Sequence, residues 1–145
     1  RYQGYREILE QNEIPFIPEY LVEGERGRIG ARVMTKKLMA LNNPPTAIFA
    51  SSDTHAIGVL DAAKEMDIEV PAALSVIGYD NIRDSAYNNL TTIDQSLFYS
   101  GAQGAQVLLD VLGNRITHPC KKYVSLKLIK RNTTSAPQGL FIRNL

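Results

Sequence analysis

Three short polar clusters in the sequence combine side chains that can hold a small polar molecule. They are Gly24-Glu25-Arg26, Ser51-Ser52-Asp53 and Asp80-Asn81. A guanidinium, carboxylates, hydroxyls and an amide together can make paired hydrogen bonds to a polyhydroxylated or purine-like ligand. Each cluster follows a stretch that we expect to be a strand, and in an open parallel sheet ligands bind outside the carboxyl ends of the strands. The pattern predicts one small-molecule binding site at a sheet edge.

Each of these residues also has a purely structural explanation. Asp53 stands where a helix N-cap is expected, and capping accounts for it better than ligand contact does; Ser52 shares this ambiguity. Asp80 fits a turn as well as a binding site, because Asp is favoured in turns. Arg26 opens a basic stretch of the kind usually found on a solvated helix surface. On one helix face this stretch presents Arg28, Arg32 and Lys36.

Other kinds of chemistry have weaker support. Gly24, Gly27 and Gly30 lack the G-x-G-x-x-G spacing of a dinucleotide loop, so we expect no cofactor. His118 and Cys120 supply two potential metal ligands, whereas a structural zinc needs four, so we expect no metal. The sequence contains neither a G-x-S-x-G elbow nor an H-E-x-x-H motif. These observations favour a binding protein over an enzyme.

Composition places the chain among ordinary globular domains. Of its 145 residues 44% are hydrophobic and 21% charged, and the net charge is +1, so the chain as a whole is not marked as a binder of nucleic-acid phosphates. The apolar runs are too short to span a bilayer, so we expect no membrane contact. The single cysteine fits a reducing compartment, and the cytoplasm is the expected location.

Alternating strands and helices must position the polar clusters. Apolar residues recur at helical spacing over 1–12, 29–41, 56–63 and 98–112, and extended stretches are predicted at 19–23, 46–50, 74–79, 91–94 and 123–129. Short connections between a strand and the next helix are typical of βαβ units. The expected fold is α/β, with a parallel sheet flanked by helices. From Asn132 onward periodicity is lost, and we expect a tail.

Several segments, in the right order, resemble the LacI/GalR family of bacterial regulators. The resemblance covers roughly residues 1–135 and is specific because it involves many motifs rather than one glycine loop. The motifs are Arg1-Tyr2-Gln3-Gly4-Tyr5, Pro45 to Asp53, Ala56 to Leu60, Val70-Pro71, Leu74 to Asn81, Leu90 to Ile93 and Leu128 to Arg131.

The resemblance implies a type I periplasmic-binding-protein-like core of two subdomains with an effector in the cleft between them. Residues 1–135 would form the C-terminal portion of the effector-binding domain, with 136–145 as a tail. Within it, 1–94 and 119–131 would belong to the C-terminal subdomain, and 95–118 to a crossover and a helix of the N-terminal subdomain. The helix at residue 1 opens without a cap, so we expect the parent chain to continue upstream. Operator DNA would be contacted only through an N-terminal helix-turn-helix head outside this sequence.

The resemblance also implies which residues contact the effector. These are Arg1 in the Arg-x-x-Gly-Tyr motif, Ser52 beside the family's Asp53, and Asp80 in Gly-Tyr-Asp. The family often has a bulky residue at the position of Arg26 and Asn at the position of Ser52. Because Arg26 could bind an acidic or phosphorylated group, we expect the effector among sugars, sugar phosphates and purine-like molecules.

The family's dimer face lies on the helix after Asp53 and on the segment after Asp80, which implies a homodimer. The corresponding residues here are Thr54, Ile57, Leu60, Asp61, Lys64, Arg83 and Tyr87. The predicted function is effector sensing and dimerisation for a DNA-binding transcriptional repressor. The alternative is an exported, monomeric sugar-binding receptor of an ABC-type transport system. An enzyme that uses Asp53 or Asp80 as a base ranks last, because neither a nucleophile nor a metal set accompanies them.

Overall fold

The computed structural model describes residues 1–116 and 121–137. The two candidate metal ligands considered above, His118 and Cys120, and most of the predicted tail therefore lie outside the described residues. The helices are α1 (Tyr2–Gln11), α2 (Gly27–Met39), α3 (Asp53–Glu65), α4 (Arg83–Tyr87) and α5 (Leu97–Leu112), with a 3-10 turn at Pro18–Tyr20. The strands are β1 (Ala47–Phe49), β2 (Ser75–Asp80), β3 (Thr91–Asp94) and β4 (Lys127–Ile129).

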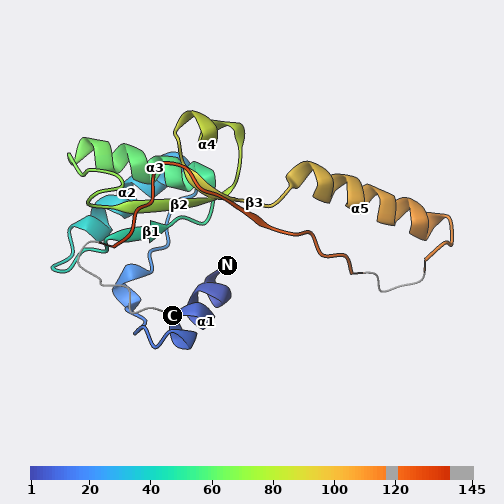
Figure 1. Ribbon diagram of the computed structural model, residues 1–145, viewed down its shortest axis with the longest axis horizontal. Coiled ribbons are helices and arrows are strands. Elements are labelled where there is room, and N and C mark those ends of the chain that lie inside the picture. Colours follow the sequence, from blue (N-terminus) through green and yellow to red (C-terminus); the bar gives the residue numbers. More distant parts are fainter. Residues whose placement is uncertain (117–120, 138–145) are drawn as a thin grey trace.

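The four strands form one sheet in the order β1-β2-β3-β4 (Figure 1). The first three are parallel, as predicted, whereas β4 runs antiparallel to β3. The α/β class is confirmed, and the sheet is mixed rather than purely parallel. Since β1, β2 and β3 point the same way, the loops that follow them emerge at one edge.

The strand predicted at 19–23 is wrong. Pro18–Tyr20 forms a 3-10 turn, and Leu21 beyond it is extended but is not assigned to the sheet. Proline suits the first position of such a turn because its φ is fixed and it has no N–H to donate. β1 is consequently the edge strand of the described sheet, and Arg26 does not follow a strand.

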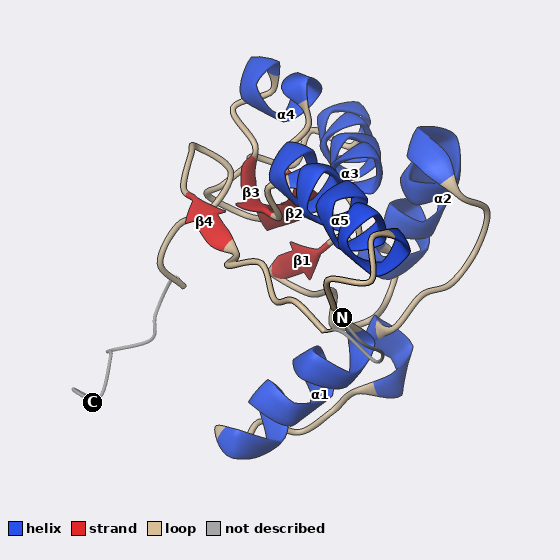
Figure 2. Ribbon diagram, turned by 90° about the vertical axis from the view of Figure 1, so that its right-hand side faces the viewer, coloured by secondary structure: helices blue, strands red, loops and turns tan. Residues whose placement is uncertain are grey.

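Helices α2 and α3 cover one face of the sheet, and α1 lies on the opposite side (Figures 1 and 2). The core cluster on the α3 face includes Ala56, Val59, Leu74, Val76 and Leu90. Helix α2 reaches α3 through small residues, because a Cβ added at Gly58 would collide with the Arg28 carbonyl and the Ala31 side chain.

The apolar residues at helical spacing in 29–41 are not all on the buried face of α2. Ala31, Thr35 and Leu38 are buried, whereas Ile29 is 73% exposed and Val33 51% exposed. Hydrophobic spacing alone favours the larger residues, but the close approach to Gly58 requires the small ones. The outward basic residues form ion pairs with α3: Arg28 with Asp61, and Arg32 and Lys36 with Glu65 at 3.1 and 2.7 Å.

Residues 132–135 are not a free tail. The Val76 N–H donates to the Thr133 carbonyl at 2.7 Å, and the Thr133 hydroxyl donates to the Val76 carbonyl at 2.7 Å. The Thr91 N–H donates to the same hydroxyl at 2.9 Å. Thr133 is 5% exposed and joins β2 to the start of β3, so this part of the tail prediction is wrong.

Helix α5 and the described residues that lead from 121 to β4 project from the body as an arm (Figure 1). The helix matches the predicted range and ends at Gly113, but none of its residues is buried. Phe98 is 92% exposed and Leu112 71% exposed. The assignment of this helix to a second subdomain stays a prediction.

Candidate functional site

The loops that follow β1, β2 and β3 meet at the carboxyl edge of the sheet. Asp80 at the end of β2 is in register with Asp94 at the end of β3. On the other side of β2, Arg1 reaches the loop after β1, where its Nη1 donates to the Ser51 carbonyl at 2.7 Å. This edge therefore gathers charged and polar groups from four segments of the chain.

Arg1 is the cation of this edge. Its Nη2 lies 3.7 Å from Asp80 Oδ1, and its guanidinium carbon lies 3.9 Å from the centre of the Tyr79 ring. The Arg1 side chain is 42% exposed and that of Asp80 is 20% exposed. A partly exposed guanidinium, a carboxylate and an aromatic face in mutual contact can hydrogen-bond a polar ligand and stack against it.

The position of the Asp80 side chain is fixed by an unusual backbone conformation and by hydrogen bonds to neighbouring residues. Its φ is +126° and that of Asn81 is +56°, values that side-chain-bearing residues rarely adopt. The Gln95 amide nitrogen donates to Asp80 Oδ1 at 2.5 Å, and Arg131 Nη2 donates to Asn81 at 2.8 Å. Strained backbone of this kind concentrates at functional sites. The turn explanation and the binding explanation of Asp80 are thus compatible.

Ser52 is the N-cap of α3. Its hydroxyl accepts a hydrogen bond from the His55 N–H at 3.2 Å and lies 2.8 Å from His55 Nδ1. The Gly27 N–H donates to His55 Nε2 at 3.2 Å, so Nδ1 carries the ring proton and donates toward the serine. Ser52 therefore fixes the start of α3 next to Ser51, whose carbonyl accepts the hydrogen bond from Arg1.

Asp53 lies in the core behind the carboxyl edge of the sheet and is not on its surface. It is fully buried and is the first residue of α3, not its cap. Its Oδ1 accepts the Thr92 hydroxyl, and its Oδ2 accepts the Ile82 N–H at 2.9 Å. Both oxygens thus have protein donors, and the expectation that Asp53 contacts the ligand is corrected on this ground. Asp53 fixes α3 to β3 and to the loop after β2.

Arg26 is an exposed N-cap residue of α2. Its side chain is not among the hydrogen-bond or ion-pair partners of Arg1 and Asp80, and the 19–23 segment before it does not form the predicted strand. A role for Arg26 in binding an acidic effector stays a prediction.

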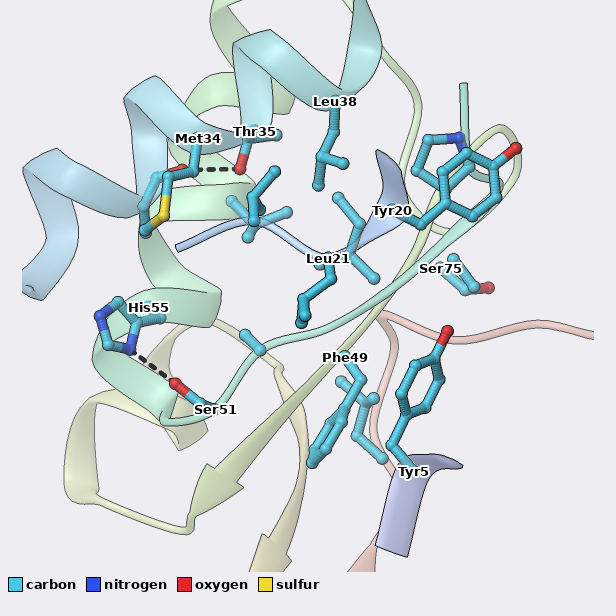
Figure 3. A pocket seen from close by; sticks show the side chains of 18 of the residues that line it. Tyr5, Tyr20, Leu21, Met34, Thr35, Leu38, Phe49, Ser51, His55 and Ser75 are labelled. Atoms are coloured by element: carbon cyan, nitrogen blue, oxygen red, sulfur yellow. Dashed lines mark hydrogen bonds between the residues drawn. The ribbon is translucent and has the colours of Figure 1, made fainter. Parts of the chain in front are cut away.

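A mainly apolar pocket of about 520 Å³ adjoins this edge (Figure 3). Its apolar wall includes Tyr5 from α1, Leu21, Leu38 from α2 and Phe49 from β1, which Figure 3 shows gathered around it. Its polar end includes Arg1, Ser51 and His55. The pocket and the polar edge therefore share Arg1.

The structure corrects one of the expected dimer residues. Ile57 is 5% exposed and belongs to the core, so it cannot form an outer contact without rearrangement. Asp61 is paired with Arg28 and Leu60 is half-buried. The remaining expected interface residues lie on the surface, namely Thr54, Lys64, Arg83 and Tyr87. Their role in a dimer stays a prediction.

Within residues 1–116 and 121–137, no group of three or more His, Cys, Asp or Glu side chains is placed to hold a metal ion. Over the same part of the chain, every helix is too short or too polar to cross a membrane.

Gln95 and Tyr79 were not singled out from the sequence, yet both contact the central pair. Gln95 directly follows β3. Asp80 was selected because ligands bind outside the carboxyl ends of parallel strands, and the same argument applied to the predicted extended stretch 91–94 would have selected Gln95. Tyr79 precedes Asp80 and faces Arg1, a contact that depends on where α1 packs.

Comparison with known proteins gives a consistent result. Residues 1–134 match a family model for a periplasmic binding protein-like domain. The HTH-type transcriptional repressor PurR of Yersinia pestis biovar Antiqua (strain Antiqua) is 33% identical over 137 residues, which are 93% of this chain and 40% of the relative.

Solved structures of LacI-type regulators share the fold. A transcriptional regulator LacI from Bacillus cereus subsp. cytotoxis NVH 391-98 superposes with a TM-score of 0.86 at 28% identity, covering 92% of this chain and 48% of that one. A LacI family regulator from Enterococcus faecium with bound ribose gives 0.84 at 29% identity, covering 92% and 50%. The chain spans 40% of the length of the curated relatives that it matches.

Proposed function

Because this chain belongs to the periplasmic binding protein-like domain family, with LacI-type regulators among its relatives, we propose that it senses a small-molecule effector for a DNA-binding transcriptional repressor. The observation that carries this proposal is the convergence of Arg1, Tyr79, Asp80 and Gln95 at one sheet edge. The carboxylate, the guanidinium and the amide present hydrogen-bonding groups to one partly exposed place.

The effector is a sugar, a sugar phosphate or a purine-like molecule. Asp80 can accept hydrogen bonds from hydroxyl or ring N–H groups, and Arg1 can donate to ring or phosphate oxygens. The ribose bound to the Enterococcus faecium regulator supports the sugar class.

The mechanism is a shift between two arrangements of the sensing domain. An effector held at this edge and by a facing second subdomain favours the closed arrangement by its differential affinity for the two states. Gln95 directly follows β3 and lies two residues before the start of α5, so closure would alter the direction of the arm. In a homodimer this change would alter the distance between two DNA-binding heads. The protein would work in the cytoplasm, where its operator DNA lies.

The regulator is favoured over a transport receptor because the relatives are transcription regulators. The same relatives are not enzymes, which agrees with a binding role. Asp53 would be a poor general base, because both of its oxygens accept hydrogen bonds inside the core.

Thermal-shift screening of the 145-residue chain tests the proposal. A ligand that binds only the folded state raises Tm with concentration. We expect at least one member of a panel of pentoses, hexoses, their phosphates and free purines to raise Tm in a saturable way. A panel that leaves Tm unchanged at millimolar concentration contradicts the proposed ligand classes.

A further inference from the structure

We propose that the effector is amphipathic, with an apolar, aromatic group that occupies the pocket beside β1 while its hydrogen-bonding head contacts Arg1 and Asp80. This inference rests on the proposed function and narrows its ligand class from simple sugars to molecules that join a polar head to an aromatic group, such as aryl glycosides.

The size and lining of the pocket carry the first step. A volume of about 520 Å³ falls within the range of small-molecule sites, which is roughly 300–1,000 Å³. Four aromatic side chains line it from three different segments: Tyr2 and Tyr5 of α1, Tyr20 of the 3-10 turn and Phe49 of β1. Aromatic walls favour an aromatic occupant, because offset and edge-to-face ring contacts add to the burial of apolar area.

The second step is that these walls are exposed while the pocket is empty of protein side chains. Tyr2 is 50% exposed, Leu21 41% and Phe49 42%, although they lie next to a packed sheet. An exposed apolar surface with a polar rim is typical of a binding site, because covering it removes apolar area from water. A plain sugar covers such a wall less well than an aromatic group does, because a hydroxyl buried there without a hydrogen-bonding partner costs free energy.

The third step is that one residue joins the pocket to the polar edge. Arg1 lines the pocket, donates to the Ser51 carbonyl at 2.7 Å and lies 3.7 Å from Asp80. Ser51 and His55 line the same end, and their side chains are 3.2 Å apart. A ligand with its head at Arg1 therefore directs its apolar part toward Phe49 and Leu21.

Paired glycosides test the inference in the 145-residue chain. Isothermal titration calorimetry compares methyl and 4-nitrophenyl β-D-glycosides of ribose, glucose and galactose. We expect the 4-nitrophenyl member of the bound pair to bind at least about tenfold more tightly, the gain from burying one ring. The chain has no tryptophan, so quenching of tyrosine emission by the nitrophenyl group provides a second readout at the three pocket tyrosines.

The variant Ala47→Phe tests whether the nitrophenyl group lies in the pocket beside β1. Ala47 lines the pocket on β1, and phenylalanine there occupies its space while suiting a strand. We expect this variant to lose the nitrophenyl preference and to bind the methyl glycoside as before. Ala102→Phe, on the exposed surface of α5, is the matched control and should behave like the original chain. Circular dichroism confirms that both variants fold.

The outcomes separate the two proposals. Equal affinity for the methyl and nitrophenyl members overturns the amphipathic ligand while the effector site stands. A preference that persists in folded Ala47→Phe overturns the pocket as its location. If no glycoside of either kind binds and the phosphates and purines of the thermal panel also fail, the proposed function falls and this inference falls with it.

Discussion

Two carboxylates near the same sheet edge have different roles because their surroundings differ. Asp80 is partly exposed and contacts Arg1 and Gln95, so it can exchange these partners for a ligand. Asp53 is fully buried and accepts hydrogen bonds from Thr92 and from the Ile82 N–H. The sequence identified both as candidates, but spacing does not reveal burial, so it could not separate Asp80, the proposed binding residue, from the buried Asp53.

We expect Asp53→Asn to lower the free energy of unfolding by about 1–3 kcal/mol, because one of the two buried donors then faces an NH₂ group. Urea denaturation followed by circular dichroism measures this. Asp67→Asn, at an exposed turn with φ +53°, is the control and should change stability little. Equal stability of the two variants would show that Asp53 does not hold the edge together.

The alternation of helices and strands was predictable because it follows from hydrophobic periodicity and from Pro and Gly positions. The α5 range and β3 match their predictions closely. Two features of the fold could not be predicted, and the physical reason is the same for both. Thr133 docks through hydrogen bonds to Val76 and Thr91, and α2 turns Ala31 and Thr35 inward because α3 approaches at Gly58. Long-range partners decide both, and neither leaves a periodic signal.

The ion pairs between α2 and α3 give a pH-dependent contribution to stability. The hydrogen bond from Arg28 holds the pKa of Asp61 below its ordinary value of 3.8. A carboxyl whose pKa is lowered by folding stabilises the folded state above its unfolded pKa and loses this effect as pH falls through the folded pKa. The pair is partly exposed, so its contribution at pH 7 is about 0.2–1 kcal/mol.

We therefore expect Asp61→Asn to have a slightly lower Tm than the original chain at pH 7, and the difference to disappear as the pH is lowered below 3.8. Differential scanning calorimetry across this range measures it. A Tm difference that stays constant at low pH would contradict the assignment, as would one that grows.

At the scale of the whole molecule, the body and the arm differ in how much they bury. The body packs α2 and α3 on the sheet, whereas α5 exposes its apolar residues along its length. Hydrophobic spacing predicted a helix over residues 98–112, but it does not predict the positive φ of Ser96, the residue directly before this helix.

We expect the 145-residue chain to self-associate, by dimerisation or domain swapping, because the exposed apolar surface of α5 is unfavourable in water. Sedimentation velocity at several concentrations tests this, and Phe98→Ser with Leu112→Ser should shift the distribution toward the monomer. A monodisperse monomer of the original chain would contradict the expectation.

Asp80 is the residue that we propose holds the effector. Isothermal titration calorimetry of Asp80→Asn and Asp67→Asn, with whichever panel ligand raises Tm, measures this directly, because both changes remove one carboxylate at a residue with positive φ. We predict that Asp80→Asn weakens binding at least about tenfold, from the loss of a charged hydrogen bond, and that Asp67→Asn leaves it unchanged. Equal affinity in the two variants would contradict the account.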